Sequence, residues 1–435
     1  MDEFIIKTLG PGRFNSPLQE WQDPDGRGFH FREERERILI ENRLTEVLSH
    51  RPDRESIPGL EVAGPRRELF FDPPKTGIGI VTCGGLCPGL NNVIRDLVLN
   101  SWHVYGVRHI VGFRYGYRGL TDPELQVTLR PAMVKDIHEQ GGSILSSSRG
   151  EQKVSRMVDA LVDSEISVLF VIGGDGSMRG ALAICREIER RGLEISVIGI
   201  PKTIDNDLRF MDQSFGFDTA YTKALEAIDG AHREAEGAPN GIGLVRLMGR
   251  HSGFIACFAT LASNQVNFTL IPEVPFVLEG PNGFLEALKK RLEKREHAVI
   301  VVAEGAGQDI LQNAGQEKDA SGNIRLKDIG IYLADRIKSY FTDQGMETNL
   351  KYIDPSYIIR SVKANASDSV LCSALALNAV HAGLAGKTEM SVAIWRRSLV
   401  HVPLSKVVEG RNQVDPSGAL WLSVLASTGQ PMAFH

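Results

Sequence analysis

One carboxylate set among glycines is the first feature of this sequence that fits a chemical task. The segment VIGGDGSMRGALAI (171–184) surrounds Asp175 with Gly173, Gly174 and Gly176, after an apolar run and before a helix-like pattern. Glycines leave room for a phosphate group against the backbone, and a carboxylate there suits Mg²⁺, which takes oxygen ligands. A purely structural turn does not need an embedded acid. The segment therefore predicts a site for phosphate and Mg²⁺, with Asp175 as the metal ligand.

A second pair of acids lies in the segment IPKTIDNDLRF (200–210), where Asp205 and Asp207 follow Lys202 and Thr203. Transfer of a phosphoryl group to an alcohol needs a group that accepts the hydroxyl proton, and a carboxylate near metal-bound phosphate can do this. The other acid could orient the site or contact Mg²⁺ through water. The alternative is an Asx-rich turn that caps a helix.

Further polar residues follow other apolar runs. The glycine-rich segment TCGGLCPGLNNVIRD, at residues 82–96, precedes a predicted helix whose amide groups would face an anion. Arg250, in RLMGRHSGF, has a planar guanidinium whose N–H donors match the phosphate group of a phosphosugar. Glu304 could accept sugar hydroxyls, and Tyr357 and Arg360 could share one phosphate. Each also has a structural alternative, such as a packing turn or a surface arginine.

Short apolar runs alternate with helix-period segments and glycine-rich turns from Lys75 onward. Continuous apolar strands alternating with amphipathic helices predict βαβ units with parallel sheets buried on both faces. Ligands of such sheets bind beyond the carboxyl ends of the strands, where most of the residues above lie. The predicted strands are 77–81, 167–172, 195–200, 241–247 and 298–303.

Composition limits the class of protein. The chain has 435 residues, 42% hydrophobic and 24% charged, which indicates a globular protein of about two domains. The net charge of −5 does not indicate general binding to nucleic acid or to an anionic membrane, which would favour a positive charge. Five scattered cysteines suit free thiols in a reducing compartment. No signal peptide is apparent, and residues 251–272 predict a buried helix followed by a strand rather than a membrane span, so we expect a cytoplasmic protein.

Two segments outside this pattern differ in character. Residues 1–74 form an N-terminal extension whose charge-rich stretch FREERERILIENRLTEVL predicts a helix. We expect it to pack on the body of the protein or on a neighbouring subunit, with a partly mobile arm as the alternative. The polar segment that begins near residue 305 predicts a surface loop leading into a helix at 331–341.

Together, these segments and their order resemble the phosphofructokinase family over about residues 75–400. The motifs GGLCPGLN, SSRG, GGDGS, PKTIDND and MGR and a Tyr-x-x-Arg pair occur in the family's order. The resemblance implies an α/β fold of two similar three-layer, Rossmann-like domains with mainly parallel sheets and the active site in the cleft between them. It implies transfer of the ATP γ-phosphoryl group to the 1-hydroxyl of fructose 6-phosphate, with Mg²⁺, as in glycolysis.

The resemblance also implies roles for individual residues. Asp205 is the proton acceptor, Thr203 contacts the sugar, Asp207 supports the base, and Asp175 holds Mg²⁺. The nucleotide site comprises Gly85, Tyr117, Arg149, Gly150, Gly174, Asp175, Gly176, Ser177 and Gly180. The fructose 6-phosphate site comprises Thr203, Ile204, Asp205, Met248, Gly249, Arg250, Glu304, Tyr357 and Arg360.

The identity of the phosphoryl donor depends on two positions. Pyrophosphate-dependent members of the family typically carry a second Asp after GGD and a Lys before TIDND. This chain has Gly176 at the first position and Lys202 at the second. Because an Asp at the first position would crowd and repel the α-phosphate of a nucleotide, Gly176 favours ATP. The pattern resembles the ATP-dependent subgroup that is close in sequence to the pyrophosphate enzymes.

Three alternatives stay open. A pyrophosphate-dependent phosphofructokinase is the nearest, and a GGDG kinase of the NAD or lipid type would not explain the other motifs. A non-catalytic regulatory subunit that binds sugar phosphate would usually lose its acids. We expect a homo-oligomer, a dimer or a tetramer. The expected domains are an extension at 1–74, a donor domain at 75–217 completed by 361–395, and a fructose 6-phosphate domain at 218–360 completed by 396–435.

Overall fold

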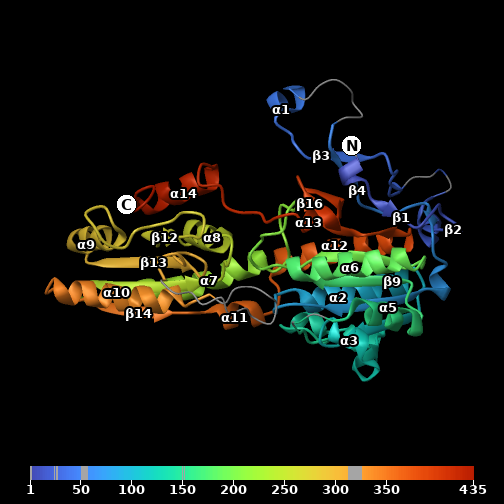
Figure 1. Cartoon of the computed structure of the whole chain (residues 1–435), viewed down its shortest axis with the longest axis horizontal. Coiled ribbons are helices and arrows are strands. Elements are labelled where there is room, and N and C mark those ends of the chain that lie inside the picture. The colour runs from blue at the N-terminus through green and yellow to red at the C-terminus, as the bar shows by residue number, and fades with distance from the viewer. Residues whose placement is uncertain are drawn as a thin grey trace. The chain divides into compact units, whose positions relative to one another are not determined.

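The computed structural model of the chain describes residues 2–23, 25, 28–49, 57–148, 150, 152–311 and 326–435. Contacts between residues divide the chain into two compact units (Figure 1). The first unit contains 1–203, 208–216 and 362–410, and the second contains 204–207, 217–361 and 411–435. Both are α/β units with mainly parallel strands, which confirms the predicted fold class.

The first unit is built on one large sheet. In its described part, nine strands have the order β3-β4-β17-β16-β10-β9-β6-β7-β8. The central strands from β16 to β7 pair in parallel, and antiparallel strands complete both edges. The strands are β3 (Arg37–Leu39), β4 (Gly59–Val62), β6 (Gly77–Thr82), β7 (His109–Phe113), β8 (Gln126–Thr128), β9 (Val168–Gly173), β10 (Ser196–Pro201), β16 (Met390–Trp395) and β17 (Ser398–Pro403).

Helices cover both faces of this sheet (Figure 1). The helix α12 packs against α2 and β10, while α5 and α6 pack together, with α6 on β9 and β10. Central strands such as β9 are buried along their whole length, as parallel strands between two helical layers must be. The helices are α1 (Leu44–Ser49), α2 (Leu90–Leu99), α3 (Arg118–Thr121), α4 (Pro131–Val134), α5 (Val154–Asp163), α6 (Asp175–Arg190), α12 (Ala366–Leu384) and α13 (Leu404–Val407).

The prediction of a helix in the N-terminal extension is largely wrong. Residues 37–39 form strand β3, antiparallel to β4, and only residues 44–49 are helical. The hydrogen bonds with β4 and the packing of Ile38 and Ile40 against the core outweigh the helical pattern of the charges. The described part of the extension therefore supplies two strands at one edge of the sheet. Its remaining strands form two-residue ladders, β1 (Lys7–Thr8) with β15 (Lys387–Thr388) and β2 (Phe14–Asn15) with β5 (Glu68–Leu69).

The second unit has a parallel sheet with the order β12-β13-β11-β14 among the described residues. One apolar cluster lies under α7, α8 and α14, and another under α9 and α10, so helices flank both faces (Figure 1). The elements are α7 (Phe217–Glu236), β11 (Gly241–Leu247), α8 (Phe254–Ser263), β12 (Phe268–Leu270), α9 (Phe284–Arg295), β13 (His297–Ala303), α10 (Ile329–Asp343), β14 (Asn349–Ile353), α11 (Ser356–Ser361) and α14 (Ala419–Thr428).

The central strands of both units lie where the sequence predicts them. The five predicted strands are present, each within one residue of its expected ends, and the helix-then-strand reading of 251–272 is confirmed by α8 and β12. Most of the predicted surface loop lies outside the described residues, at 312–325, whereas the helix that follows it is α10. All five cysteines are buried with free thiols. Within the described ranges, none of the helices combines the length and the apolar character that a bilayer span requires.

Candidate active site

Residues that we predicted to lie near the phosphoryl donor follow three adjacent parallel strands of the first unit. β10, β9 and β6 are neighbours, so Lys202, Gly174 and Gly85 follow neighbouring strand ends. The backbone N–H of Lys202 donates to the Gly173 carbonyl at 3.0 Å, and its ammonium Nζ donates to the Gly85 carbonyl at 2.8 Å. The buried lysine thus ties the two glycine-rich turns together. The structure brings these predicted residues to one edge of the sheet, where an open α/β sheet binds ligands.

The GGDG turn leads directly into helix α6, which begins at Asp175. A Cβ atom at Gly173 would lie 2.2 Å from the Ser177 side chain, so this position has no room for a side chain. A Cβ atom at Gly176 would meet nothing within 4 Å. The first turn of α6 therefore presents open space at Gly176, and the N-terminal end of a helix favours an anion.

Tyr117 lies beside this first helical turn. Its hydroxyl donates to the Ser177 carbonyl at 2.5 Å, and a Cβ atom at Gly180 would lie 2.5 Å from its ring. Tyr117 is half-buried and packs against the core, and burial raises the pKa of its hydroxyl well above the usual range. The structure thus places Tyr117, Ser177 and Gly180 together. Gly150 is described with a left-handed φ of 116°, while Arg149 lies outside the described residues.

The chain passes from the first unit to the second within the PKTIDND segment, after Thr203. Asn206, between the two acids, has a left-handed φ of 54°, a conformation that Asn tolerates better than most residues. Asp207 is buried, and the Arg411 guanidinium donates to its Oδ2 at 2.7 Å. Asp207 therefore anchors the segment through Arg411.

Asp205 is held by the segment MGRHS. The backbone N–H of Arg250 lies 3.4 Å from Asp205 Oδ2, and the Ser252 hydroxyl donates to the Asp205 carbonyl at 3.0 Å. Burial raises the pKa of the Asp205 carboxyl well above its usual range, and the negative charges of Asp207 and Glu304 raise it further. A carboxyl group with a raised pKa is a stronger base than an ordinary aspartate, as a proton acceptor requires.

Met248, Gly249 and Arg250 follow strand β11, and Glu304 follows its neighbour β13. The N–H of Glu304 donates to the Leu247 carbonyl at 2.9 Å, and the next amide donates to Gly249 at 3.0 Å. Gly249 has a left-handed φ of 126°, and a Cβ there would lie 2.5 Å from the Ser252 carbonyl, so glycine is required. The two turns therefore form one packed surface in the second unit.

The predicted Tyr-x-x-Arg pair lies on the short helix α11. The Arg360 guanidinium lies 4.5 Å from the centre of the Tyr357 ring, and Tyr357 is 73% exposed. Burial raises the pKa of Glu304, and the positive charges of Arg246, Arg250 and Arg360 oppose this shift. Ile204 is half-buried and packs against the apolar cluster under α7 and α8.

Two arginines of this region were not predicted. Arg246 pairs with Glu304 at 3.0 Å and with Asp354 at 2.5 Å, and it orients the Glu304 carboxylate. A charged residue inside the apolar strand GIGLVRL is a signal that could have identified it. The other is Arg411, which binds Asp207 from 204 positions away in the sequence and belongs to no motif.

The donor end of the site fits Mg²⁺. Asp175 has a side chain 15% exposed, at the start of a helix that faces open space at Gly176. Arg179 lies 3.1 Å from Asp175 Oδ1 and is itself 57% exposed, so it can move aside or neutralise phosphate oxygens. A carboxylate oxygen at the start of a helix would suit Mg²⁺, which takes oxygen ligands from protein side chains and from phosphates.

Each unit has features that suit phosphoryl transfer: glycine-lined strand ends beside Asp175 in the first, and a buried acid with a raised pKa, Asp205, in the second. Comparison with known proteins agrees, since a sequence profile described as Phosphofructokinase matches residues 77–383. The chain belongs to the phosphofructokinase family.

Two similar curated proteins are named ATP-dependent 6-phosphofructokinase. The one from Amycolatopsis methanolica is 49% identical, with 100% of this chain and 96% of that protein covered. The one from Borreliella burgdorferi is 49% identical, with 99% and 97% covered. Among solved structures, a pyrophosphate-dependent phosphofructokinase from Marinobacter aquaeolei has a TM-score of 0.67 at 22% identity, covering 82% of this chain and 93% of that one. The structural likeness supports the fold.

Proposed function

We propose that this protein is an ATP-dependent 6-phosphofructokinase, which transfers the γ-phosphoryl group of ATP to the 1-hydroxyl of fructose 6-phosphate. The observation that carries the proposal is the position of Asp205, fixed by the Arg250 amide and Ser252 and given a raised pKa by burial. The names of relatives that match the whole chain support the same activity.

In this reaction the protein's own groups bind, orient and accept a proton. Asp205 takes the proton of the sugar hydroxyl as the new P–O bond forms, and Thr203 contacts the same sugar. The fructose moiety is held by Met248, Gly249, Arg250 and Glu304, with Arg246 keeping the Glu304 carboxylate in place. The 6-phosphate is bound by Tyr357 and Arg360. Asp207, paired with Arg411, keeps the Asp205 segment in position.

The donor is held by the glycine-rich edge of the first unit. The backbone around Gly85, Gly174 and Gly176 receives the phosphates, and Arg149, Gly150, Tyr117, Ser177 and Gly180 complete the nucleotide site. Asp175 would hold Mg²⁺, which neutralises charge on the transferred phosphoryl group when it is bound.

One assay tests the proposal against its alternatives. Purified protein is incubated with fructose 6-phosphate and either Mg-ATP or Mg-pyrophosphate, and fructose 1,6-bisphosphate is measured. We expect product with ATP. Product with pyrophosphate alone would favour the pyrophosphate-dependent alternative that Lys202 suggests, and no product with either would favour a regulatory subunit.

Gly176→Asp should raise the KM for ATP by at least about tenfold, because a carboxylate would face the α-phosphate at short range. The site has room for the new side chain, since a Cβ atom at Gly176 meets nothing within 4 Å, so the variant should fold normally. Gly176→Asn is the matched control, with nearly the same shape and no charge. Steady-state kinetics with both variants measure the effect. Equal KM values for ATP in the two variants would show that charge at this position does not select the donor.

We also expect this enzyme to form a dimer or tetramer of identical chains. Light scattering after size-exclusion chromatography measures the mass in solution. A single species at the mass of one chain, 47.8 kDa, would contradict this expectation.

A further inference from the structure

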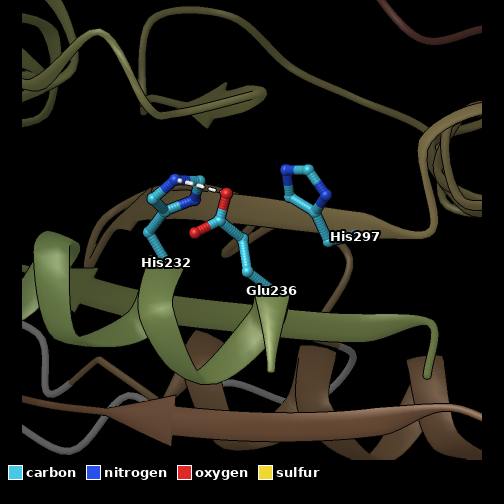
Figure 2. A group of neighbouring side chains, drawn as sticks. All are labelled: His232, Glu236 and His297. Atoms are coloured by element: carbon cyan, nitrogen blue, oxygen red, sulfur yellow. Dashed lines mark ion pairs between the residues drawn. The ribbon is translucent and has the colours of Figure 1, made fainter. Parts of the chain in front are cut away.

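Two histidines and a glutamate meet in the second unit, away from the residues discussed so far (Figure 2). His232 and Glu236 lie one turn apart near the end of α7, and His297 is the first residue of β13. Each offers one ligand atom, and these atoms all lie within 4.8 Å of one another. This is the single group of its kind among the described residues.

The hydrogen bonds around the cluster suit a metal. The Nδ1 atom of His297 lies 3.0 Å from the Arg295 carbonyl, which can only accept, so Nδ1 carries the proton. The lone pair of this ring is therefore on Nε2, and Figure 2 shows one nitrogen of His297 directed toward Glu236 and His232. A backbone carbonyl that fixes the tautomer of a histidine is a common second partner of a metal-bound ring.

The spacing of the three groups is near that of a small transition-metal site. His232 Nε2 lies 3.4 Å from Glu236 Oε1. Ligand bonds of about 2.1 Å in tetrahedral geometry space the ligand atoms about 3.4 Å apart. The exposed Glu236 and the half-buried His297 can rotate inward to close the remaining distance.

The cluster lies at the opposite end of the sheet from the proposed sugar site. Strand β13 begins at His297 and ends at Ala303, just before Glu304. Seven residues of extended strand span about 20 Å. A metal at the cluster would therefore not contact the substrate, and its effect would be on the contact between α7 and β13.

We propose that His232, Glu236 and His297 bind a divalent transition metal of the Zn²⁺ class, which ties the last turn of α7 to the start of β13. Two imidazole nitrogens and one carboxylate oxygen are a ligand set typical of Zn²⁺, with water in the remaining position, whereas Mg²⁺ prefers oxygen ligands. Arg233, which pairs with Glu236 Oε2 at 2.9 Å, places a positive charge nearby. We therefore expect micromolar rather than nanomolar affinity.

The test is a Zn²⁺ titration of the full-length protein, with millimolar Mg²⁺ present to occupy sites made of oxygen ligands. Zn²⁺ binding is measured by calorimetry, and Co²⁺ is used separately as a probe with visible absorption. The cysteines contribute little background, since burial raises the pKa of Cys83, Cys185, Cys257 and Cys372.

His297→Ala and Glu236→Gln remove one ligand each. His138→Ala is the matched control, because His138 lies the same 3.4 Å from a glutamate, Glu139, but is not in the cluster. We expect the wild-type protein and His138→Ala each to bind one more equivalent of Zn²⁺ than His297→Ala and Glu236→Gln do. The wild-type protein and His138→Ala should also show a Zn²⁺-dependent rise in melting temperature and a Co²⁺ absorption band.

Equal Zn²⁺ binding by the wild-type protein and His297→Ala would overturn the proposal, as would the same loss in His138→Ala. Because every measurement is made without substrate, its outcome is independent of the proposed phosphofructokinase activity.

Discussion

Asp205→Asn is expected to lower kcat by about a thousandfold, while the KM for fructose 6-phosphate changes by less than about fivefold. The amide has nearly the same shape and can still contact the sugar, but it cannot accept the hydroxyl proton. The loss should therefore appear in turnover rather than in affinity. Steady-state kinetics with saturating Mg-ATP, together with circular dichroism to verify folding, measure it.

Asp212→Asn is the matched control for this variant. It makes the same chemical change in the same connecting segment, at an exposed carboxylate that accepts a hydrogen bond from the Arg397 amide at 3.2 Å. We expect its kcat to stay within about twofold of the wild-type value, as for a surface change outside the site. A folded Asp205→Asn enzyme with turnover similar to that of Asp212→Asn would show that another group is the base.

The pH dependence of the wild-type enzyme follows from the same carboxyl group. Burial, then the charges of Asp207 and Glu304, raise the pKa of Asp205. A base must be ionised to accept a proton, so kcat/KM should be full above this raised pKa and fall as the pH decreases through it. The acidic limb should therefore lie above the usual range of an aspartate. In Glu304→Gln the limb should move to lower pH, because one of the negative neighbours is gone.

The sheets and the candidate site were predictable for a common reason. A parallel strand buried on both faces must be a continuous apolar run, so GIGLVRL predicted the ends of β11 as observed. Once the strand ends are predicted, the residues that follow them can be placed at one edge of a sheet without any information on tertiary contacts. The motif residues Asp175 and Asp205 could be found in this way, since each directly follows such a run or lies a few residues beyond it.

What escaped prediction depends on partners distant in sequence. The stretch around Arg37 has a helical charge pattern, but its pairing with β4 converts it to a strand. The helical propensity of exposed charged residues is worth only tenths of a kcal/mol per residue, which tertiary contacts readily exceed. Arg411 likewise has no local signal, because its role exists only where it meets Asp207.

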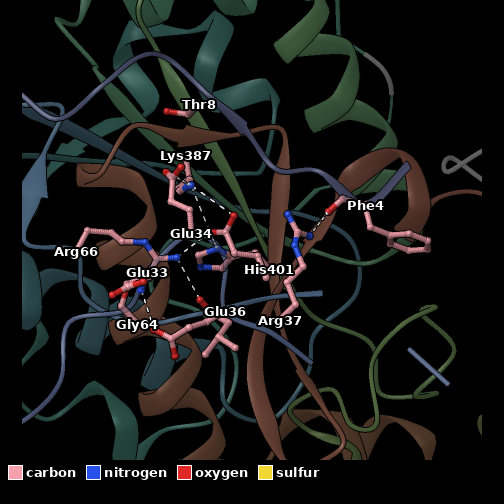
Figure 3. Close-up of polar contacts among 12 residues, drawn as sticks. Phe4, Thr8, Glu33, Glu34, Glu36, Arg37, Gly64, Arg66, Lys387 and His401 are labelled. Carbon is pink, nitrogen blue, oxygen red and sulfur yellow. Dashed lines mark hydrogen bonds and ion pairs between the residues drawn. The ribbon is translucent and has the colours of Figure 1, made fainter. Parts of the chain in front are cut away.

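The N-terminal extension contributes a buried charge that should be critical for stability. Glu61 in β4 is 3% exposed, and it accepts hydrogen bonds from Arg66 at 2.7 Å and from His401 Nδ1 at 3.1 Å. The Lys387 ammonium lies 3.3 Å from the same carboxylate. Figure 3 shows Arg66, Lys387 and His401 gathered around this point, where the extension meets strand β17 and the end of α12. Burial by itself would raise the pKa of Glu61, but His401, Lys387 and Arg66 lower it to about 2.

Glu61→Gln should destabilise the protein by about 3–5 kcal/mol, because it keeps the shape of the side chain but leaves the buried Arg66 guanidinium without its anion and Lys387 with only the exposed Glu34. Chemical denaturation followed by circular dichroism measures the loss. Glu194→Gln is the matched control, since Glu194 pairs with Arg13 at 2.8 Å on the exposed surface. Removal of that pair should cost less than about 1 kcal/mol.

The pH dependence distinguishes a lost charge from a general packing defect. The folded-state pKa of Glu61, about 2, lies below its ordinary value of 4.5, so its stabilisation is complete above the ordinary value and is lost as the pH falls toward 2. The stability difference between wild type and Glu61→Gln should therefore be largest near neutral pH and shrink below pH 4.5. A difference that stays constant over this range would mean that the glutamine disturbs packing, and that the charge of Glu61 does not hold the extension on the sheet.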